Sequence, residues 1–122
     1  MYQLAITRDF IARHYLTGGD WGAENQEHSH HYRVEILVSG KTLDQHGYLI
    51  DIVELEEALN GIIDIFRECT LNDLEPFRGL NPSLEHFARI FSEMLSVKLP
   101  LDDRSLVVKL WENANDWASY RG

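Results

Sequence analysis

Cysteine is almost absent from this chain, which contains one, Cys69, in 122 residues. A single thiol cannot close a disulfide within the chain, so the sequence excludes a disulfide-stabilised scaffold. Basic residues are also scarce: 11 Lys and Arg stand against 20 Asp and Glu, which gives a formal net charge of −9. Because neither a basic run nor a basic helix is present, we expect no nucleic-acid partner and no binding to an anionic membrane.

Long apolar runs are missing as well. No uninterrupted apolar stretch approaches the ~18 residues that a membrane span needs, and the N-terminus enters strand-like sequence without a basic and apolar signal region. These absences predict a soluble, cytoplasmic protein. The 44% apolar content predicts one domain over residues 1–122 with a modest core. At this size, several copies of a chain often associate to bury more surface.

The hydrophobic pattern places strands at both ends of the chain. Residues 2–8 and 31–39 alternate loosely between apolar and polar side chains, which is typical of half-buried antiparallel strands. A glycine-rich loop over residues 17–22 lies between them. Residues 105–112 alternate again and place one row of side chains on a single face: Leu106, Val108, Leu110 and Glu112.

Two helices are predicted between these strands. Asp51 and Glu54 have capping-box spacing at the start of residues 51–66, whose apolar stripe is Ile52, Leu55, Leu59, Ile62, Ile63 and Phe66. Asn81 as N-cap and Pro82 at the first helical position begin a second helix, whose stripe is Leu84, Phe87, Ala88, Phe91, Met94 and Leu95. Both stripes are expected to pack in the core.

Three histidines stand out in the strand-like sequence. His28 and His30 are two residues apart, so they share one strand face, and His14 shares its face with Phe10 and Ala12. If the two strands are antiparallel neighbours, the three imidazoles converge. Three neutral imidazoles with a fourth position open are the ligand set of a catalytic zinc. The alternative is a half-exposed strand in a chain that has six His.

Glu112 is the second informative position, because it continues an apolar row with a carboxylate. Such an acid is either partnered or lies at the end of the sheet, within reach of a ligand. A carboxylate accepts two parallel N–H bonds from an amidine-like edge, which a pterin or guanine ring provides. The alternative is that Glu112 is simply the first residue beyond the core.

Taken together, the chain resembles the 6-pyruvoyl-tetrahydropterin synthase and 6-carboxy-tetrahydropterin synthase family. The resemblance runs in order over nearly the whole sequence. Its pieces are Phe10-x-Ala12-x-His14, His28-x-His30, Gly47-Tyr48-Leu49-Ile50-Asp51, Leu71-Asn72, Asn81-Pro82-Ser83-x-Glu85, and Glu112 followed by Tyr120.

This resemblance implies an α+β tunnelling fold, in which a four-stranded antiparallel sheet carries two helices on one side. Copies of that fold assemble into a multi-subunit barrel, here a trimer or hexamer, with active sites between subunits. The resemblance also implies that His14, His28 and His30 bind Zn²⁺ and that Glu112 anchors a pterin ring. Ser83 helps to hold the ring, at a position where the family usually has Thr.

The chain departs from the synthase pattern at the catalytic positions. The synthases have a catalytic Cys four residues before the first His of the His-x-His pair, where this chain has Glu24. Their Asp-His pair before the Leu-Asn match is replaced by Arg67 and Glu68, with Cys69 one place further. Glu24 is therefore the first candidate for the catalytic base and Glu68 the second. Cys69 is more consistent with a small buried side chain than with a displaced nucleophile.

Three functions are compatible with these residues. The leading one is a zinc-dependent pterin lyase or synthase that acts on the side chain of a dihydropterin. A family branch with Glu in this region is associated with cleaving dihydroneopterin triphosphate to 6-hydroxymethyl-dihydropterin, although that branch generally keeps the Asp-His pair. The second is a catalytically silent pterin-binding protein that kept the metal and the ring anchor. The third is a related enzyme acting on a purine.

Overall fold

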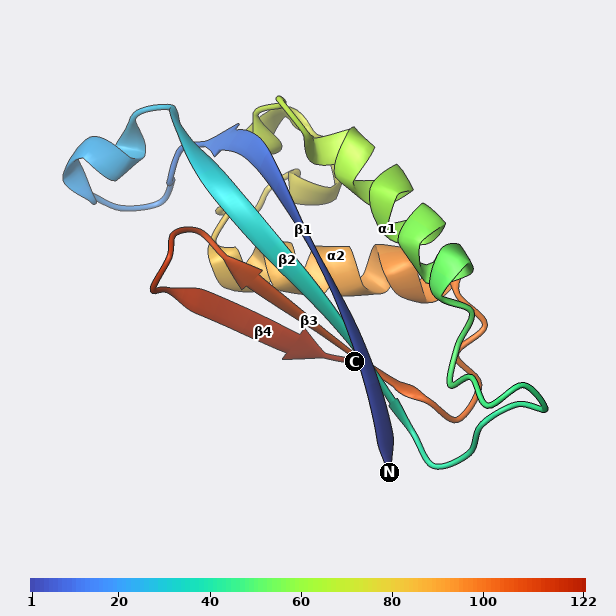
Figure 1. The fold of residues 1–122 in the computed structure, drawn as a ribbon. Helices are drawn as coiled ribbons and strands as arrows, with labels where there is room; N and C mark the ends of the chain where they lie inside the picture. Colours follow the sequence, from blue (N-terminus) through green and yellow to red (C-terminus); the bar gives the residue numbers. More distant parts are fainter.

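A four-stranded antiparallel sheet forms one layer of the molecule and two helices form the other (Figure 1). The computed structural model describes residues 1–122. The strands lie side by side in the order in which they occur in the sequence. They are β1 (Tyr2–His14), β2 (His28–Gly40), β3 (Ser105–Trp111) and β4 (Trp117–Arg121). The helices are α1 (Ile52–Phe66) and α2 (Leu84–Lys98). This arrangement confirms the predicted fold class.

The β1–β2 hairpin is longer than its alternation predicts. Both strands have 13 residues, whereas the predicted ranges are 2–8 and 31–39. The inward row of β1 continues through Phe10, Ala12 and His14, all of which are buried. The alternating ranges cover only part of each strand, and the strand-like sequence predicted around His14, His28 and His30 forms the remaining end of the pair.

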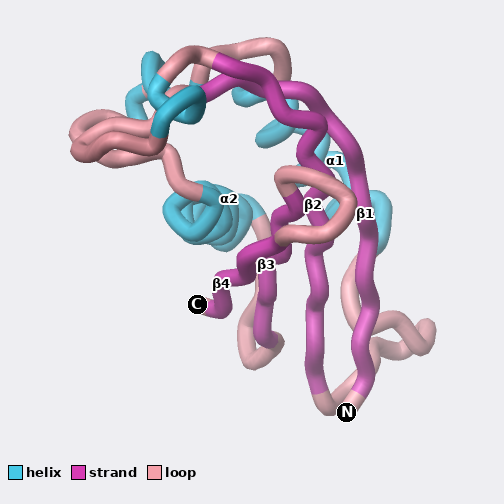
Figure 2. The backbone as a smooth tube through the Cα atoms, turned by 90° about the vertical axis from the view of Figure 1, so that its left-hand side faces the viewer, coloured by secondary structure: helices cyan, strands magenta, loops and turns pink.

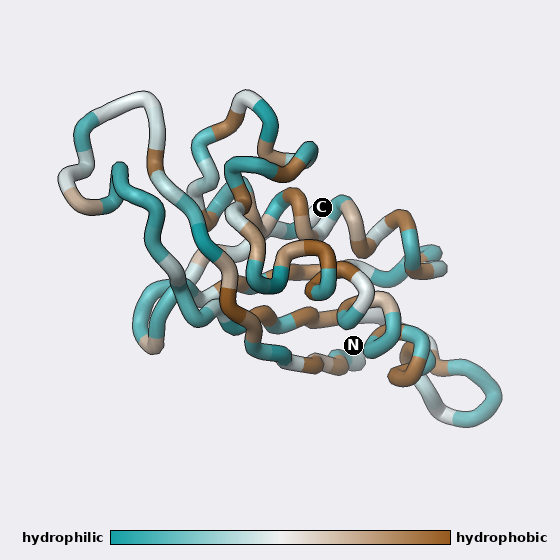
Figure 3. Tube along the Cα trace, turned by 90° about the horizontal axis from the view of Figure 1, so that it is seen from above, coloured by the Kyte–Doolittle hydropathy of each residue, from teal (hydrophilic) through white to brown (hydrophobic).

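The sheet is strongly curved. Figure 2 shows β1 and β2 bending along their length, so that the sheet wraps partly around α2. Both helices pack on the same face of the sheet, and the opposite face carries the exposed residues of each strand. Hydropathy follows this division: Figure 3 shows hydrophobic residues recurring along strands and helices, while the projecting loops are mainly hydrophilic.

Aromatic rings fill the core below the end of the sheet that carries the histidines. Tyr32 stacks on Phe10 with ring centroids 5.5 Å apart, and its ring meets the edge of Phe87 at 5.2 Å. All three rings are at least 96% buried. This packing fixes the inner face of the hairpin, and therefore also fixes the positions of the side chains at its end.

Helix α1 begins as predicted, because the Asp51 carboxylate accepts a hydrogen bond from the Val53 N–H at 3.0 Å. One residue of its predicted stripe is wrong: Ile52 is 44% exposed. It lies in the first turn, before the helix packs on the sheet. The remaining residues of the stripe are buried.

Helix α2 begins two residues later than predicted. Its N-cap is Ser83, whose Oγ accepts a hydrogen bond from the His86 N–H at 3.1 Å. Asn81 and Pro82 precede the helix: the Asn81 side chain accepts from Thr17 in the loop after β1, and the Pro82 carbonyl accepts from His14 at the end of β1. The predicted strand over 105–112 ends at Trp111, so Glu112 is the first residue beyond it. Neither helix is long and apolar enough to cross a membrane.

Candidate metal and substrate site

The register of the β1–β2 hairpin brings three imidazoles together. His14 pairs directly with His28, and His30 pairs with Ala12. Because Ala12 has only a methyl side chain, the His30 ring has room beside the other two. The ring centroids lie 4.6 Å (His14–His28), 5.0 Å (His14–His30) and 4.8 Å (His28–His30) apart. The predicted convergence is therefore present.

Backbone carbonyls orient two of these rings. Nδ1 of His14 lies 2.9 Å from the Pro82 carbonyl oxygen, and Nδ1 of His28 lies 2.7 Å from that of Gln26. A carbonyl oxygen only accepts, so each Nδ1 carries the proton and donates it. The Nε2 atom of each ring is then left with its lone pair directed inward, which is the form of a histidine that binds metals.

Four potential metal-ligand atoms lie close together. Nε2 of His28 lies 3.1 Å from Nε2 of His30 and 2.8 Å from Oε2 of Glu24. Nε2 of His14 is buried and has no hydrogen-bond partner. One ligand atom from each of the four residues lies within 4.8 Å of the others. Three imidazole nitrogens and one carboxylate oxygen therefore face a common space, and this donor set fits a divalent cation coordinated by nitrogen and oxygen.

Glu24 reaches the cluster from the loop between the two strands. It lies in a short 3-10 helix, Gly22–Asn25, and its side chain is 51% exposed. The Leu16 N–H donates to the Glu24 carbonyl oxygen at 2.8 Å, which closes the loop around this residue. Glu24 is the most solvent-accessible of the four side chains, and its carboxylate is open to the adjoining pocket.

The protonation of the site follows from its burial. Burial is the main cause that lowers the pKa of His14 from 6.5 to about 4, helped by the neighbouring His30 and His28 and opposed by the Pro82 carbonyl and Glu24. His14 is consequently a neutral ligand near pH 7. Burial also raises the pKa of Tyr32, beneath the cluster, so its hydroxyl stays protonated.

A pocket of about 330 Å³ opens beside the cluster and contains both Ser83 and Glu112. Its lining residues are His14, Leu16, Trp21, Glu24, Asn81, Ser83, Leu84, Glu85 and Glu112. Two of these, Trp21 and Glu85, carry chemistry that the sequence reasoning did not assign. The Ser83-x-Glu85 spacing in the sequence could have indicated that Glu85 lies near Ser83 at the site. Trp21 had no signal beyond being an aromatic residue in a glycine-rich loop.

Two asparagines hold the loop that follows His14. Asn72 makes a paired contact with Tyr15, accepting from its N–H at 3.0 Å and donating to its carbonyl at 2.9 Å. The Asn81 side chain accepts from the Thr17 N–H at 2.8 Å. These bonds explain physically why Leu71-Asn72 and Asn81-Pro82 accompany the histidines: they fix the chain as it leaves β1.

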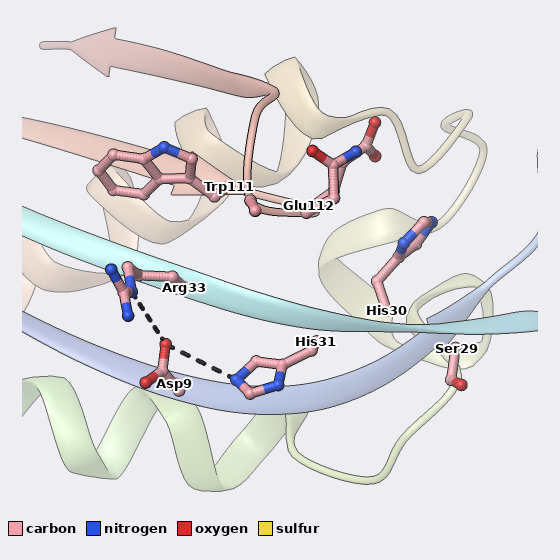
Figure 4. Close-up of a pocket in the computed structure, with 9 residues that line it drawn as sticks. Asp9, Ser29, His30, His31, Arg33, Trp111 and Glu112 are labelled. Atoms are coloured by element: carbon pink, nitrogen blue, oxygen red, sulfur yellow. Dashed lines mark hydrogen bonds and ion pairs between the residues drawn. The ribbon is translucent and has the colours of Figure 1, made fainter.

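A second and larger pocket adjoins the first at the end of β3. Figure 4 shows His30 and Glu112 at one end of it, and Trp111, Arg33, Asp9 and His31 at the other. Asp9 lies 3.2 Å from Nε of Arg33 and 3.7 Å from Nε2 of His31. His31 therefore points to the outer face of the sheet, away from the metal cluster, as its position in the strand predicts.

The family model for 6-pyruvoyl tetrahydropterin synthase matches residues 3–122. This chain belongs to that family. The predicted resemblance is thus confirmed, and the matched range contains every residue of the cluster and of its pocket.

Characterised relatives in the family process pterins. The chain is 27% identical to the dihydroneopterin monophosphate aldolase of Pyrococcus furiosus over 103 residues, which cover 84% of this chain and 82% of that protein. It is 32% identical to the 6-carboxy-5,6,7,8-tetrahydropterin synthase of Bacillus subtilis over 78 residues, covering 62% of this chain and 51% of that protein. A pterin-processing activity is therefore the shared property of these relatives.

Solved structures confirm the tunnelling fold. The Caenorhabditis elegans 6-pyruvoyl tetrahydropterin synthase superposes with a TM-score of 0.90 at 20% identity, covering 99% of this chain and 95% of that chain. A Plasmodium vivax 6-pyruvoyltetrahydropterin synthase superposes with a TM-score of 0.84 at 14% identity, covering 99% of this chain and 97% of that one. The latter is described as a mutant of a catalytic residue, in which a glutamate is replaced by alanine.

Glu68, the second candidate base, does not join the cluster within the chain. It follows α1 with a positive φ of 60°, its carboxylate is 66% exposed, and its Oε2 lies 3.8 Å from Nη1 of Arg13. Arg13 and His14 are consecutive in β1, so their side chains point to opposite faces. Cys69 is partly buried, and its carbonyl accepts from the Arg13 N–H at 2.9 Å.

Proposed function

We propose that this protein is a zinc-dependent pterin lyase that cleaves the side chain of a phosphorylated 7,8-dihydroneopterin, in an aldolase-like reaction. The observation that carries the proposal is the convergence of three imidazole nitrogens and the Glu24 carboxylate beside a pocket lined by further carboxylates. The name of the Pyrococcus relative supports the choice of substrate class.

His14, His28 and His30 would hold the zinc ion through their Nε2 atoms. When bound, zinc supplies Lewis acidity, which lowers the pKa of hydroxyl groups such as those of a dihydropterin side chain. The protein's own contribution is orientation: the Pro82 and Gln26 carbonyls fix two of the rings before any ion arrives. Burial keeps His14 unprotonated, so no proton has to be displaced from it at neutral pH.

Glu24 would act as the general base. In a retro-aldol cleavage, a base accepts the proton of the hydroxyl on the second side-chain carbon. The bond between the first and second carbons then breaks, its electron pair passes into the pterin ring, and the second and third carbons leave as a phosphorylated glycolaldehyde. A proton returned to the first carbon gives 6-hydroxymethyl-dihydropterin. Glu24 is exposed, stands at the pocket and contacts His28, so it can both accept and return that proton.

The pocket carboxylates would select the heterocycle. Glu112 and Glu85 line the same pocket as Glu24, and no Lys or Arg lines it. Their acceptor oxygens match the N–H groups on the amidine-like edge of a pterin ring, which offers two parallel donors. Ser83 also lines the pocket, although its Oγ is already the N-cap acceptor of α2. We therefore assign it a secondary role in holding the ring.

The deciding experiment is product analysis. Zinc-loaded protein is incubated with 7,8-dihydroneopterin monophosphate and, separately, with the triphosphate, and the pterin products are separated by chromatography. We expect 6-hydroxymethyl-dihydropterin. A 6-pyruvoyl or 6-carboxy product would instead assign a synthase reaction. The Glu24→Gln variant should bind pterin nearly normally while its turnover falls by roughly two to four orders of magnitude.

One observation favours a silent pterin-binding protein as the second candidate. Oε2 of Glu24 lies 2.8 Å from Nε2 of His28, close enough for Glu24 to become a fourth metal ligand. Four protein ligands close a zinc site, as in structural zinc centres, and leave no position for substrate. In that case Glu24→Gln should weaken zinc binding, and neither parent nor variant should turn over a dihydropterin that both bind.

We also propose that the chain functions as a homo-oligomer, a trimer or hexamer, in the cytoplasm. The outer edge of β4 is unpaired in the single chain, and an unpaired edge is a surface that a second copy can extend. We expect the copies to form a barrel because the chain belongs to the 6-pyruvoyl tetrahydropterin synthase family. Light scattering at micromolar concentration measures the assembly, and a monomeric mass would contradict this proposal.

A further inference from the structure

The side chain of Trp21 does not pack in the hydrophobic core. It is 46% exposed, although aromatic side chains of this size are usually well buried. It lines the pocket beside His14, Glu24 and Glu112, and no Phe, Tyr or other Trp lines that pocket. An exposed aromatic face next to acid groups therefore requires an explanation that packing within the single chain does not give.

The loop holds Trp21 in a defined position. The Asn25 side chain accepts from the Trp21 N–H at 2.7 Å and donates to the carbonyls of Leu16 and Gly19, each at 3.0 Å. The six-membered ring of Trp21 lies so close to Gly19 that a Cβ there would be 2.7 Å from Cη2. A side chain at position 19 would displace the indole, so the glycine helps to present the indole to the pocket already ordered.

One turn of the loop positions both Trp21 and Glu24 at the pocket. Trp21 is the N-cap of the 3-10 helix, and the Glu24 N–H donates to the Trp21 carbonyl at 3.3 Å. Residues three apart in a 3-10 helix lie above one another on one side. The loop therefore delivers an aromatic face and a carboxylate together to the edge of the metal cluster.

We propose that Trp21 stacks on the heterocyclic ring of the substrate and is a specificity-determining residue of this site. This inference rests on the proposed pterin chemistry. A flat heterocyclic ring is bound through acceptors in its plane, which pair with its N–H groups, and through an aromatic surface against its face. Glu112 and Glu85 supply the first, and Trp21 is the group in the pocket that supplies the second.

Binding measurements test this directly. The probe is 6-hydroxymethyl-7,8-dihydropterin, which contains the ring but lacks the bond to be cleaved, and its Kd is measured by titration calorimetry with zinc-loaded protein. Trp21→Ala should weaken binding about ten- to a hundredfold, and Trp21→Phe should restore most of it. With the phosphorylated substrate, Trp21→Ala should raise KM more than it lowers kcat.

Trp117 provides the matched control. It is 51% exposed on β4 and lines no part of this pocket. Trp117→Phe should leave the Kd unchanged and retain the quenching of tryptophan fluorescence by the pterin, whereas Trp21→Phe should lose most of that quenching. Zinc content should be the same in all variants.

Two results would overturn the assignment of Trp21 while leaving the pterin chemistry intact. One is a Trp21→Ala variant that binds the probe within about twofold of the parent, the scale of a surface substitution. The other is equal loss of binding and of zinc in both Trp21→Ala and Trp21→Phe, which would show that the residue only supports the loop. If the parent protein binds no pterin, the proposed function fails and this inference fails with it.

Discussion

Acid should destabilise the metal-free protein through His14. Burial keeps the pKa of this histidine at about 4 in the folded chain, against 6.5 as the ordinary value. Between these two values the unfolded chain binds a proton that the folded chain does not. The free energy of unfolding therefore falls as the pH is lowered from 6.5, and the His14 contribution is fully lost below about 4.

The magnitude follows from the pKa difference. One pKa unit corresponds to about 1.4 kcal/mol, so lowering the pH from 7 to 4 should cost roughly 3 kcal/mol through His14 alone. This is a large part of the stability of a small domain, which is typically about 5–15 kcal/mol. The same burial leaves Nε2 of His14 without a hydrogen-bond partner, so it would favour both the proposed metal binding and the acid sensitivity.

Urea unfolding in the presence of a chelator, at pH 7 and pH 4, measures this effect. The chain also has 20 Asp and Glu, and acid destabilises proteins through carboxylates as well, so the comparison must be with His14→Gln. That variant should lose less stability between the two pH values, by roughly 3 kcal/mol. His31→Gln, at an exposed histidine on the outer face, should behave as the parent. Equal pH dependence in parent and His14→Gln would refute the argument.

Four further predictions concern the site and the scaffold. His28→Ala should lose about one equivalent of zinc by metal analysis, whereas His31→Ala should keep it, and full zinc in the first variant would contradict the ligand assignment. Glu112→Ala should weaken pterin binding about ten- to a hundredfold with zinc content unchanged, measured by calorimetry; an unchanged Kd would remove Glu112 from the ring site. Phe87→Ala, which empties a ring position that is 1% exposed, should cost about 3–5 kcal/mol in urea unfolding. Asp51→Ala should cost about 1 kcal/mol, because the first turn of α1 loses its cap.

The sequence by itself determined which residues share a face. Side chains alternate along a strand with a period of two, so His28 and His30 had to point the same way, and His14 had to continue the row of Phe10 and Ala12. The apolar stripes of the two helices could also be predicted from the sequence, because apolar residues recur with the period of the helix. Local periodicity is a property of the chain and needs no knowledge of its folding.

Helix boundaries were harder to predict from the sequence, because several neighbouring residues can each act as the N-cap. Asn81-Pro82 and Ser83 are both good N-terminal signals. Ser83 became the N-cap because the Asn81 side chain and the Pro82 carbonyl are used across the fold, by Thr17 and His14. Only the tertiary contacts of the β1 loop decide between these alternatives.

The composition of the site was decided by tertiary structure. Register places His14 opposite His28 with Ala12 making room for His30, and a one-residue slip would move the row to the other face. Glu24 and Trp21 reach the pocket through a loop whose path depends on Asn25, while Glu68 is turned toward Arg13 on the opposite side of β1. Such positions depend on hydrogen bonds between segments far apart in sequence, and no local pattern contains them.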